Sequence, residues 1–260
     1  MSFLGDSVVV SSLQRLELHI CPKLRLPMPL PSSIKQLTLE RWNDPLLNSV
    51  ETLPNLSSLC VIGFDEVETF SEAPLQNLRS LETLIIWECY TLTRLPTELE
   101  NLTTLRILKI YFCGGLESLT EGLRNLASLK ELVIGHCQSL KSLSESSLQQ
   151  LTTLETLTFS HCPNLEIFSV GFQNLIALRS LTLDCLPQLT SLPKELRHSP
   201  RLLLLRTKNC KNLKTLPKWL LNLPTLYFLD IIGCHPELHK RCKDWTGAAH
   251  LRVVNEELSL

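Results

Sequence analysis

The chain has 260 residues, of which 44% are hydrophobic but only 6% aromatic, so leucine must supply most of the buried surface. Its 25 basic and 26 acidic residues give a formal net charge of −1, which argues against a nucleic acid or a membrane surface as the main partner. No apolar run approaches the roughly 20 residues of a membrane-spanning helix, and the N-terminus lacks the pattern of a secretory signal. We therefore expect a cytoplasmic protein, with the nucleus as the alternative location.

Short strands are predicted along the whole chain, because pairs of apolar residues separated by a single residue recur throughout it. Such alternation directs two side chains inward and the residue between them outward. In chain order the pairs are Leu16 and Leu18, Leu37 and Leu39, Leu59 and Val61, Leu84 and Ile86, Leu108 and Ile110, Leu132 and Ile134, Leu157 and Phe159, Leu181 and Leu183, Leu205 and Thr207 (where threonine replaces the second apolar residue), and Leu229 and Ile231. The pattern predicts about ten repeating units, each with one strand.

A column of cysteines has the same period as the strands. Cysteines recur at intervals of 23 to 25 residues, as Cys89, Cys113, Cys137, Cys162, Cys185, Cys210 and Cys234. A disulfide framework has no reason to be periodic, whereas a structural repeat has one. We expect reduced thiols that fill a small apolar site in each unit, although disulfides between adjacent units are conceivable. In one unit Leu186 occupies the column and Cys185 precedes it, which predicts a more exposed Cys185.

The segments between the strands predict a solenoid. Each unit follows the template L-x-x-L-x-x-L-x-L-x-x-C-x-x-L-x-x-L, often with a Leu-Pro step after the cysteine, which favours an irregular or short helical connection. One such unit cannot enclose its own leucines, so the units must stack. We predict an α/β repeat fold, a leucine-rich-repeat solenoid (horseshoe) with a parallel concave sheet, over residues 13–245. Residues 1–12 form a flank, and residues 246–260 a tail.

Several sequence segments resemble a known family. Residues 105–113, 157–165, 191–196 and 229–245 are similar to the C-terminal leucine-rich repeats of plant intracellular nucleotide-binding disease-resistance proteins of the coiled-coil class. The resemblance implies a non-enzymatic module that senses a pathogen effector or a modified host protein and restrains the receptor's nucleotide-binding domain. No phosphate-binding loop of the form G-x-x-x-x-G-K-[ST] occurs here, so we expect a receptor fragment or a truncated product.

For other groupings of residues we favour a structural role over a catalytic or metal-binding one. Cys234, His235, His239 and Cys242 have a spacing that zinc could use, but the repeat column already accounts for Cys234. No Cys, His and carboxylate form a distinctive catalytic motif, so we expect neither catalytic residues nor a metal or other cofactor. Eight basic residues between positions 194 and 218, and an acidic cluster within residues 65–72, fit solvated convex loops, or a charged surface that steers a partner.

The outward face of the strands is the candidate partner-binding surface. Exposed aliphatic and aromatic residues in one contiguous column indicate an interaction patch. We expect the two large rings, Trp87 and Tyr111, to stand roughly 5 Å apart on adjacent strands. The predicted contact residues are Ile62, Ile85, Trp87, Ile107, Lys109 and Tyr111, with Arg206, Lys208, Phe228 and Asp230 near the C-terminal end.

Three other functions compete with immune recognition. The chain could be a substrate-binding domain of a ubiquitin-ligase adaptor, but only twelve residues precede the first unit, too few for a ligase-binding box. It could also be a generic repeat scaffold. An extracellular receptor ectodomain is disfavoured because its N-x-L-x-G-x-I-P phrase is missing.

Overall fold

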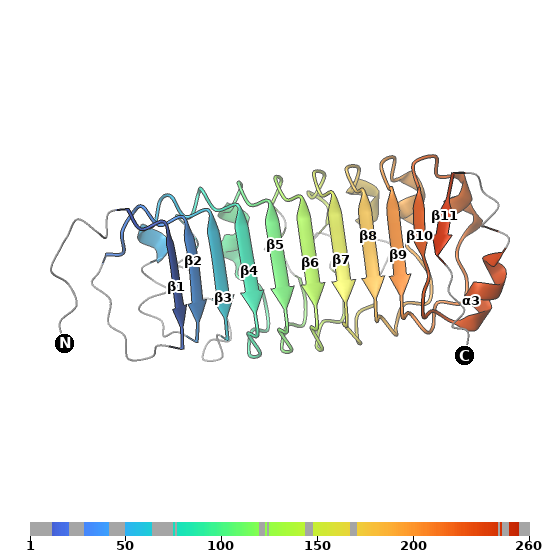
Figure 1. Ribbon diagram of the computed structural model, residues 1–260, viewed down its shortest axis with the longest axis horizontal. Helices are drawn as coiled ribbons and strands as arrows, with labels where there is room; N and C mark the ends of the chain where they lie inside the picture. Colours follow the sequence, from blue (N-terminus) through green and yellow to red (C-terminus); the bar gives the residue numbers. More distant parts are fainter. Residues whose placement is uncertain are drawn as a thin grey trace.

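The computed structural model describes residues 12–20, 29–41, 50–63, 75, 77–119, 123, 125–143, 148–166, 171–243, 245 and 250–254. These residues form one sheet of 11 strands whose spatial order is their order in the sequence (Figure 1). The strands are β1 (Arg15–His19), β2 (Gln36–Glu40), β3 (Ser58–Ile62), β4 (Thr83–Trp87), β5 (Ile107–Tyr111), β6 (Glu131–Gly135), β7 (Thr156–Ser160), β8 (Ser180–Asp184), β9 (Leu204–Lys208), β10 (Phe228–Asp230) and β11 (Arg252–Val254).

Every strand pair is parallel, and the register repeats from strand to strand. Leu84, Leu108 and Leu132 are cross-strand partners on β4, β5 and β6, as are Ile86, Ile110 and Ile134. These inward side chains are at most 1% exposed, whereas the residues beside them are half-buried on most strands. The predicted inward and outward faces are therefore confirmed, and the core is a continuous stack of leucines between neighbouring units.

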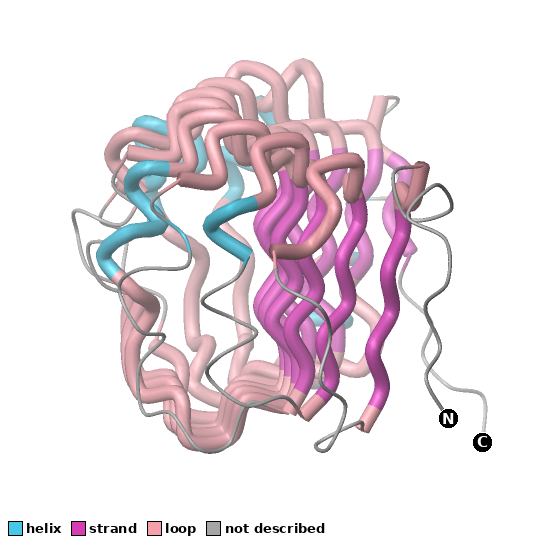
Figure 2. Tube along the Cα trace, turned by 90° about the vertical axis from the view of Figure 1, so that its left-hand side faces the viewer, coloured by secondary structure: helices cyan, strands magenta, loops and turns pink. Residues whose placement is uncertain are grey.

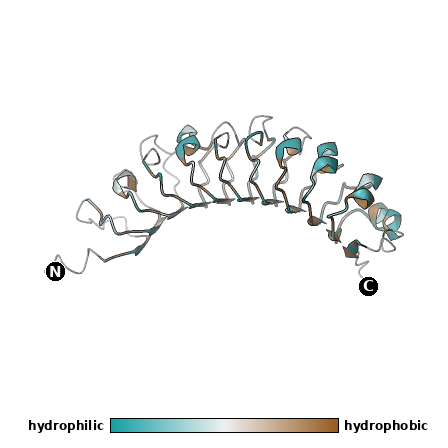
Figure 3. Cartoon of the chain, turned by 90° about the horizontal axis from the view of Figure 1, so that it is seen from above, coloured by the Kyte–Doolittle hydropathy of each residue, from teal (hydrophilic) through white to brown (hydrophobic). Residues whose placement is uncertain are grey.

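The connections opposite the sheet contain short 3-10 helices. These are η1 (Val50–Thr52), η3 (Thr97–Asn101), η6 (Phe172–Asn174), η7 (Lys194–His198) and η8 (Lys218–Asn222). Pro96, Pro193 and Pro217 immediately precede η3, η7 and η8, where a fixed φ helps to start a helical turn and no amide N–H is needed. Figure 2 shows the helices and loops on the side away from the strands, and Figure 3 shows the strands along the inner side of an arc. The expected concave sheet and short-helical convex side are confirmed.

Strands β1 to β9 each end in a left-handed turn. The residue after the strand has a positive φ in unit after unit, for example 56° at Phe112, 56° at His136 and 53° at His161. The column cysteine follows, and its thiol donates to the carbonyl two residues earlier, at 3.5 Å from Cys113 Sγ to Tyr111 O. This donation explains why a thiol suits the column: it has a carbonyl acceptor at the turn while it fills a buried site.

The cysteines within the described residues are free thiols, and most are buried. A hydrogen bond to Cys89, together with burial, raises the pKa of the Cys113 thiol, and burial raises the pKa of Cys60 to about 11. In the Cys137–Cys162 pair, the shared hydrogen bond raises the pKa of Cys137 and lowers that of Cys162. Cys185 is half-buried and Leu186 is 0% exposed, as the break in the repeat predicted.

The C-terminal end contains helix α3 (Pro236–Arg241) and then β11. Two of the four residues with zinc-like spacing have other roles there: the Cys234 thiol donates to Thr207 O at 2.6 Å, and His235 Nδ1 accepts the Glu237 N–H at the start of α3. Strand β11 pairs with β10 beyond Trp245, where the sequence predicted that the repeats end. The sheet therefore continues into the segment that we had placed in a tail.

Candidate protein-binding surface

The concave face has an apolar centre on β3, β4 and β5. Ile62, Trp87 and Tyr111 are the last residues of these strands and are cross-strand partners in register. Ile85 and Ile107 lie on the same face, and all five side chains are half-buried. The structure thus brings together the aliphatic and aromatic residues that the sequence predicted for this surface.

The two large rings are in contact. The ring centroids of Trp87 and Tyr111 are 4.9 Å apart with an interplanar angle of 47°, which confirms the expected spacing of roughly 5 Å. The indole Nε1 of Trp87 donates to Glu88 Oε1 at 3.1 Å. A tilted aromatic pair at this distance is a favourable ring contact, and both rings are partly desolvated.

A ladder of stacked rings continues from this pair along the edge of the sheet. The Phe112 ring lies 5.2 Å from Trp87 and 4.3 Å from His136, and the His136 ring lies 4.3 Å from His161. The rings of the last two pairs are nearly parallel, with interplanar angles of 9° and 12°. The sequence interpretation missed this ring ladder (Phe112, His136, His161). The sequence feature that could have indicated it is a ring-bearing residue just before the column cysteine in three successive units.

Gly135 makes room for the Tyr111 ring. A Cβ atom at Gly135 would lie 2.8 Å from Tyr111 Cδ1 and 2.8 Å from Ser160 Oγ. Both distances are shorter than side-chain packing allows, so any larger residue would displace the ring. The glycine therefore shapes the aromatic patch on β4 and β5.

Burial and, to a smaller extent, the nearby His161 lower the pKa of His136. The neutral imidazole is favoured, which suits a ring stacked between two other rings. On the neighbouring strands, Lys109 Nζ lies 2.8 Å from Glu131 Oε1, so the predicted contact residue Lys109 is ion-paired across β5 and β6. The ring ladder and a salt bridge thus border the apolar centre.

The basic end of the concave face differs from the prediction in one respect. Asp230 lies on the outward side of β10 but is only 3% exposed. Its carboxylate is 3.2 Å from Lys208 Nζ and 4.0 Å from Arg206 Nε, and it accepts the Ile232 N–H at 3.2 Å. The Arg206 guanidinium also lies 5.7 Å from the centre of the Phe228 ring. We had expected Asp230 to face a partner; instead it holds the two cations and partly neutralises them.

The remaining basic residues lie away from the concave face. Six of the eight are exposed on connecting turns and on η7 and η8: Lys194, Arg197, Arg201, Lys211, Lys214 and Lys218. This position fits solvated convex loops better than a single charged patch. The predicted acidic cluster, residues 65–72, lies outside the described residues.

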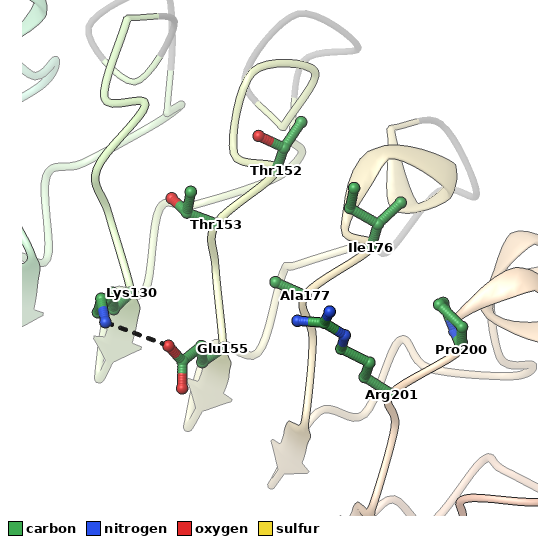
Figure 4. Close-up of a pocket in the computed structure, with 8 residues that line it drawn as sticks. All are labelled: Lys130, Thr152, Thr153, Glu155, Ile176, Ala177, Pro200 and Arg201. Carbon is green, nitrogen blue, oxygen red and sulfur yellow. Dashed lines mark ion pairs between the residues drawn. The ribbon is translucent and has the colours of Figure 1, made fainter.

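Two further surface features lie near the opposite ends of the strands. Leu203 and Tyr227 precede β9 and β10 in equivalent positions and are 41% and 61% exposed. A groove of about 420 Å³ lies beside the starts of β7 and β8 (Figure 4). Its lining includes the exposed Ile176 and an ion pair between Lys130 and Glu155 at 3.4 Å, but no histidine or cysteine. The groove offers a mixed polar and apolar surface.

Comparison with known proteins rests on structure, because no protein-family profile and no curated protein sequence matches the chain. The leucine-rich-repeat domain of the type III effector XopL is similar, with 24% identity and a TM-score of 0.59, over 86% of this chain and 73% of that one. The chain has the leucine-rich-repeat fold. A chain of the Toll–Spatzle complex from Drosophila is also similar, with 17% identity and a TM-score of 0.64.

The Toll–Spatzle match covers 93% of this chain but only 36% of the other, so these leucine-rich repeats correspond to about a third of that protein. None of the helices in the described ranges could span a lipid bilayer. Both similar structures contain leucine-rich repeats, an architecture that serves as a scaffold for protein interaction through its curved surface.

Proposed function

We propose that the chain is the protein-recognition module of a plant intracellular immune receptor. It binds a pathogen effector or a modified host protein and restrains the receptor's nucleotide-binding domain, without catalysing a reaction. The resemblance of four phrases, residues 105–113, 157–165, 191–196 and 229–245, to the repeats of such receptors supports this proposal. The structural likeness to a complex described as a hub in innate immunity is compatible with it.

The aromatic patch on the concave face carries the proposal. Trp87 and Tyr111 are large and half-buried, and they hold each other in place at 4.9 Å. Rigid aromatic residues at the centre of an open surface commonly dominate the affinity of protein interfaces. Ile62, Ile85 and Ile107 surround them and would exclude water from the contact.

Charged residues give this surface a second role in the proposed complex. Lys109 is ion-paired with Glu131, and Lys208 and Arg206 share the buried Asp230. Cations that are already paired add little net affinity but affect orientation and the rate of association. We expect Arg206, Lys208 and Phe228 to contact the partner, while Asp230 positions the two cations.

We place this function in the cytoplasm or the nucleus. The cysteines of the described segments are free thiols, and the repeat uses several of them as buried packing groups. Thiols persist in reducing compartments, whereas an oxidising compartment would favour disulfides. A fluorescent fusion of the chain that accumulates outside the cell would contradict this location.

The genomic sequence beside the repeats tests the function most simply. An immune receptor requires an upstream coding segment with a phosphate-binding loop, G-x-x-x-x-G-K-[ST], which binds the nucleotide of the switch domain. A ligase-binding box in its place would indicate a ubiquitin-ligase adaptor. Absence of both would leave a generic repeat scaffold and would contradict the proposal.

A further inference from the structure

A histidine, an aspartate and a cysteine meet at the ends of β7 and β8. His161 follows β7, Asp184 is the last residue of β8, and Cys185 comes directly after it. Each offers one ligand atom, and these atoms all lie within 4.8 Å of one another. Among the described residues, this trio is the only group of three or more such side chains that lie close enough to hold a metal ion.

The break in the cysteine column creates this cluster. In the neighbouring units the cysteine points into the core, as Cys162 and Cys210 do at 0% exposure. Here Leu186 fills the core site, so Cys185 occupies the preceding left-handed position, with a φ of 52°. That position carries Phe112, His136 and His161 in the three preceding units, so the thiol stands next to His161 at the end of the ring ladder.

The backbone and the neighbouring side chains hold the three residues in place. The backbone N–H of His161 donates to the backbone carbonyl of Asp184 at 2.9 Å, and that of Cys185 donates to the backbone carbonyl of Lys208 at 3.0 Å. The His161 ring is stacked 4.3 Å from His136, and Asn209 Nδ2 donates to Asp184 Oδ1 at 3.0 Å. An amide that orients a carboxylate is the kind of supporting contact found around metal ligands.

We propose that His161, Asp184 and Cys185 bind a divalent metal ion of the zinc class on the rim of the concave face. Imidazole nitrogen, carboxylate oxygen and thiolate sulfur are all ligands of tetrahedral Zn²⁺, and three protein ligands leave a fourth position for water. In such a site the ligand atoms are about 3.3 to 3.6 Å apart. The present atoms, within 4.8 Å, need to close by at most about 1.5 Å, which rotation of the partly exposed side chains allows.

This site is independent of the proposed immune function. It involves none of Trp87, Tyr111 or their aliphatic neighbours, and its donor set does not depend on a protein partner. The mixed nitrogen, oxygen and sulfur ligands favour Zn²⁺ or Co²⁺ over Mg²⁺ and Ca²⁺, which prefer oxygen ligands.

Titration of the reduced, metal-stripped full chain with Co²⁺ tests the proposal. We expect about one equivalent to bind, with visible bands of tetrahedral cobalt, a near-ultraviolet band of thiolate-to-cobalt charge transfer, and displacement by Zn²⁺. Cys185→Ser should remove the charge-transfer band, and Asp184→Asn should weaken binding while retaining that band. Asn209→Ala should weaken binding by about tenfold, because it removes only the supporting contact.

Matched controls locate the metal. Cys60→Ser changes another half-buried thiol on the concave side, and His198→Ala changes another exposed histidine, so both should bind Co²⁺ like the parent. Urea denaturation of each variant without metal shows whether it folds. The proposal is overturned if the parent gives no charge-transfer band, if the band survives Cys185→Ser, or if it disappears in Cys60→Ser or Cys242→Ser instead.

Discussion

Replacing Leu132 by alanine tests the stacking of the units at the middle of the sheet. Leu132 is 0% exposed on β6, and its cross-strand partners Leu108 and Leu157 are equally buried. The substitution removes three carbon atoms at about 0.8 kcal/mol each, which gives about 2.4 kcal/mol of lost transfer energy. The cavity, which the two neighbouring units share, adds to this loss, so we expect a decrease in unfolding free energy of about 2–5 kcal/mol.

Urea denaturation followed by circular dichroism measures this effect. With a slope of about 3 kcal/mol per molar urea, the midpoint should fall by about 1 M. Lys130→Ala is a suitable control, because the Lys130 side chain is 54% exposed just before the same strand. Equal midpoints for Leu132→Ala and the parent would refute the assignment of Leu132 to a shared core.

Two further predictions concern the aromatic patch and the ring ladder. Gly135→Ala should lower the unfolding free energy by about 1–3 kcal/mol and shift the NMR resonances of the Tyr111 ring, because the new Cβ would lie 2.8 Å from that ring. Gly114→Ala is the control: its Cβ would meet only the Gln138 side chain, so neither effect is expected. Equal behaviour of the two variants would contradict the explanation. The pKa of His136, measured by NMR titration, should lie below the ordinary histidine value of 6.5, and His161→Ala should raise that pKa. Since folding lowers this pKa, the unfolded chain binds more protons below about pH 6.5, so His136 should reduce stability as the pH falls; a midpoint above 6.5 would reverse the sign.

The strands and their faces could be predicted from the sequence because burial alternates along each strand. Leu108 and Ile110 had to face inward, and the fixed period placed Trp87 beside Tyr111 on the next strand. The same period exposed the break at Cys185, since a cysteine one residue early must leave the core column. These conclusions needed only the spacing of apolar residues.

The ring ladder required information that spacing does not contain. Phe112, His136 and His161 adopt a positive φ, which turns their side chains along the edge of the sheet, so that they stack on each other. Repeat spacing places the residue after a strand at the edge of the sheet but does not say in which direction its side chain points. Because these residues adopt the left-handed conformation, the sequence spacing could predict neither the ring ladder nor the cluster of His161, Asp184 and Cys185.

The burial of Asp230 depended on contacts that were also absent from the repeat pattern. Strand β11 pairs with β10 and places Val254 opposite Asp230, while Lys208 approaches the carboxylate from β9. We had assigned residues 246–260 to a tail, so no strand was expected there. An outward position was consequently mistaken for an exposed one.

Binding of Trp87→Ala to the nucleotide-binding domain of the proposed receptor tests the central claim most directly. The nucleotide-binding domain that the proposal expects beside the repeats would be expressed separately and titrated calorimetrically with the parent, Trp87→Ala and Lys218→Glu chains. Lys218 is exposed on η8, on the convex side, and serves as the control. We predict that Trp87→Ala loses about 2 kcal/mol or more, roughly a thirtyfold loss of affinity, while Lys218→Glu binds like the parent. Unchanged binding of Trp87→Ala together with loss of binding in Lys218→Glu would show that the concave face is not the recognition surface.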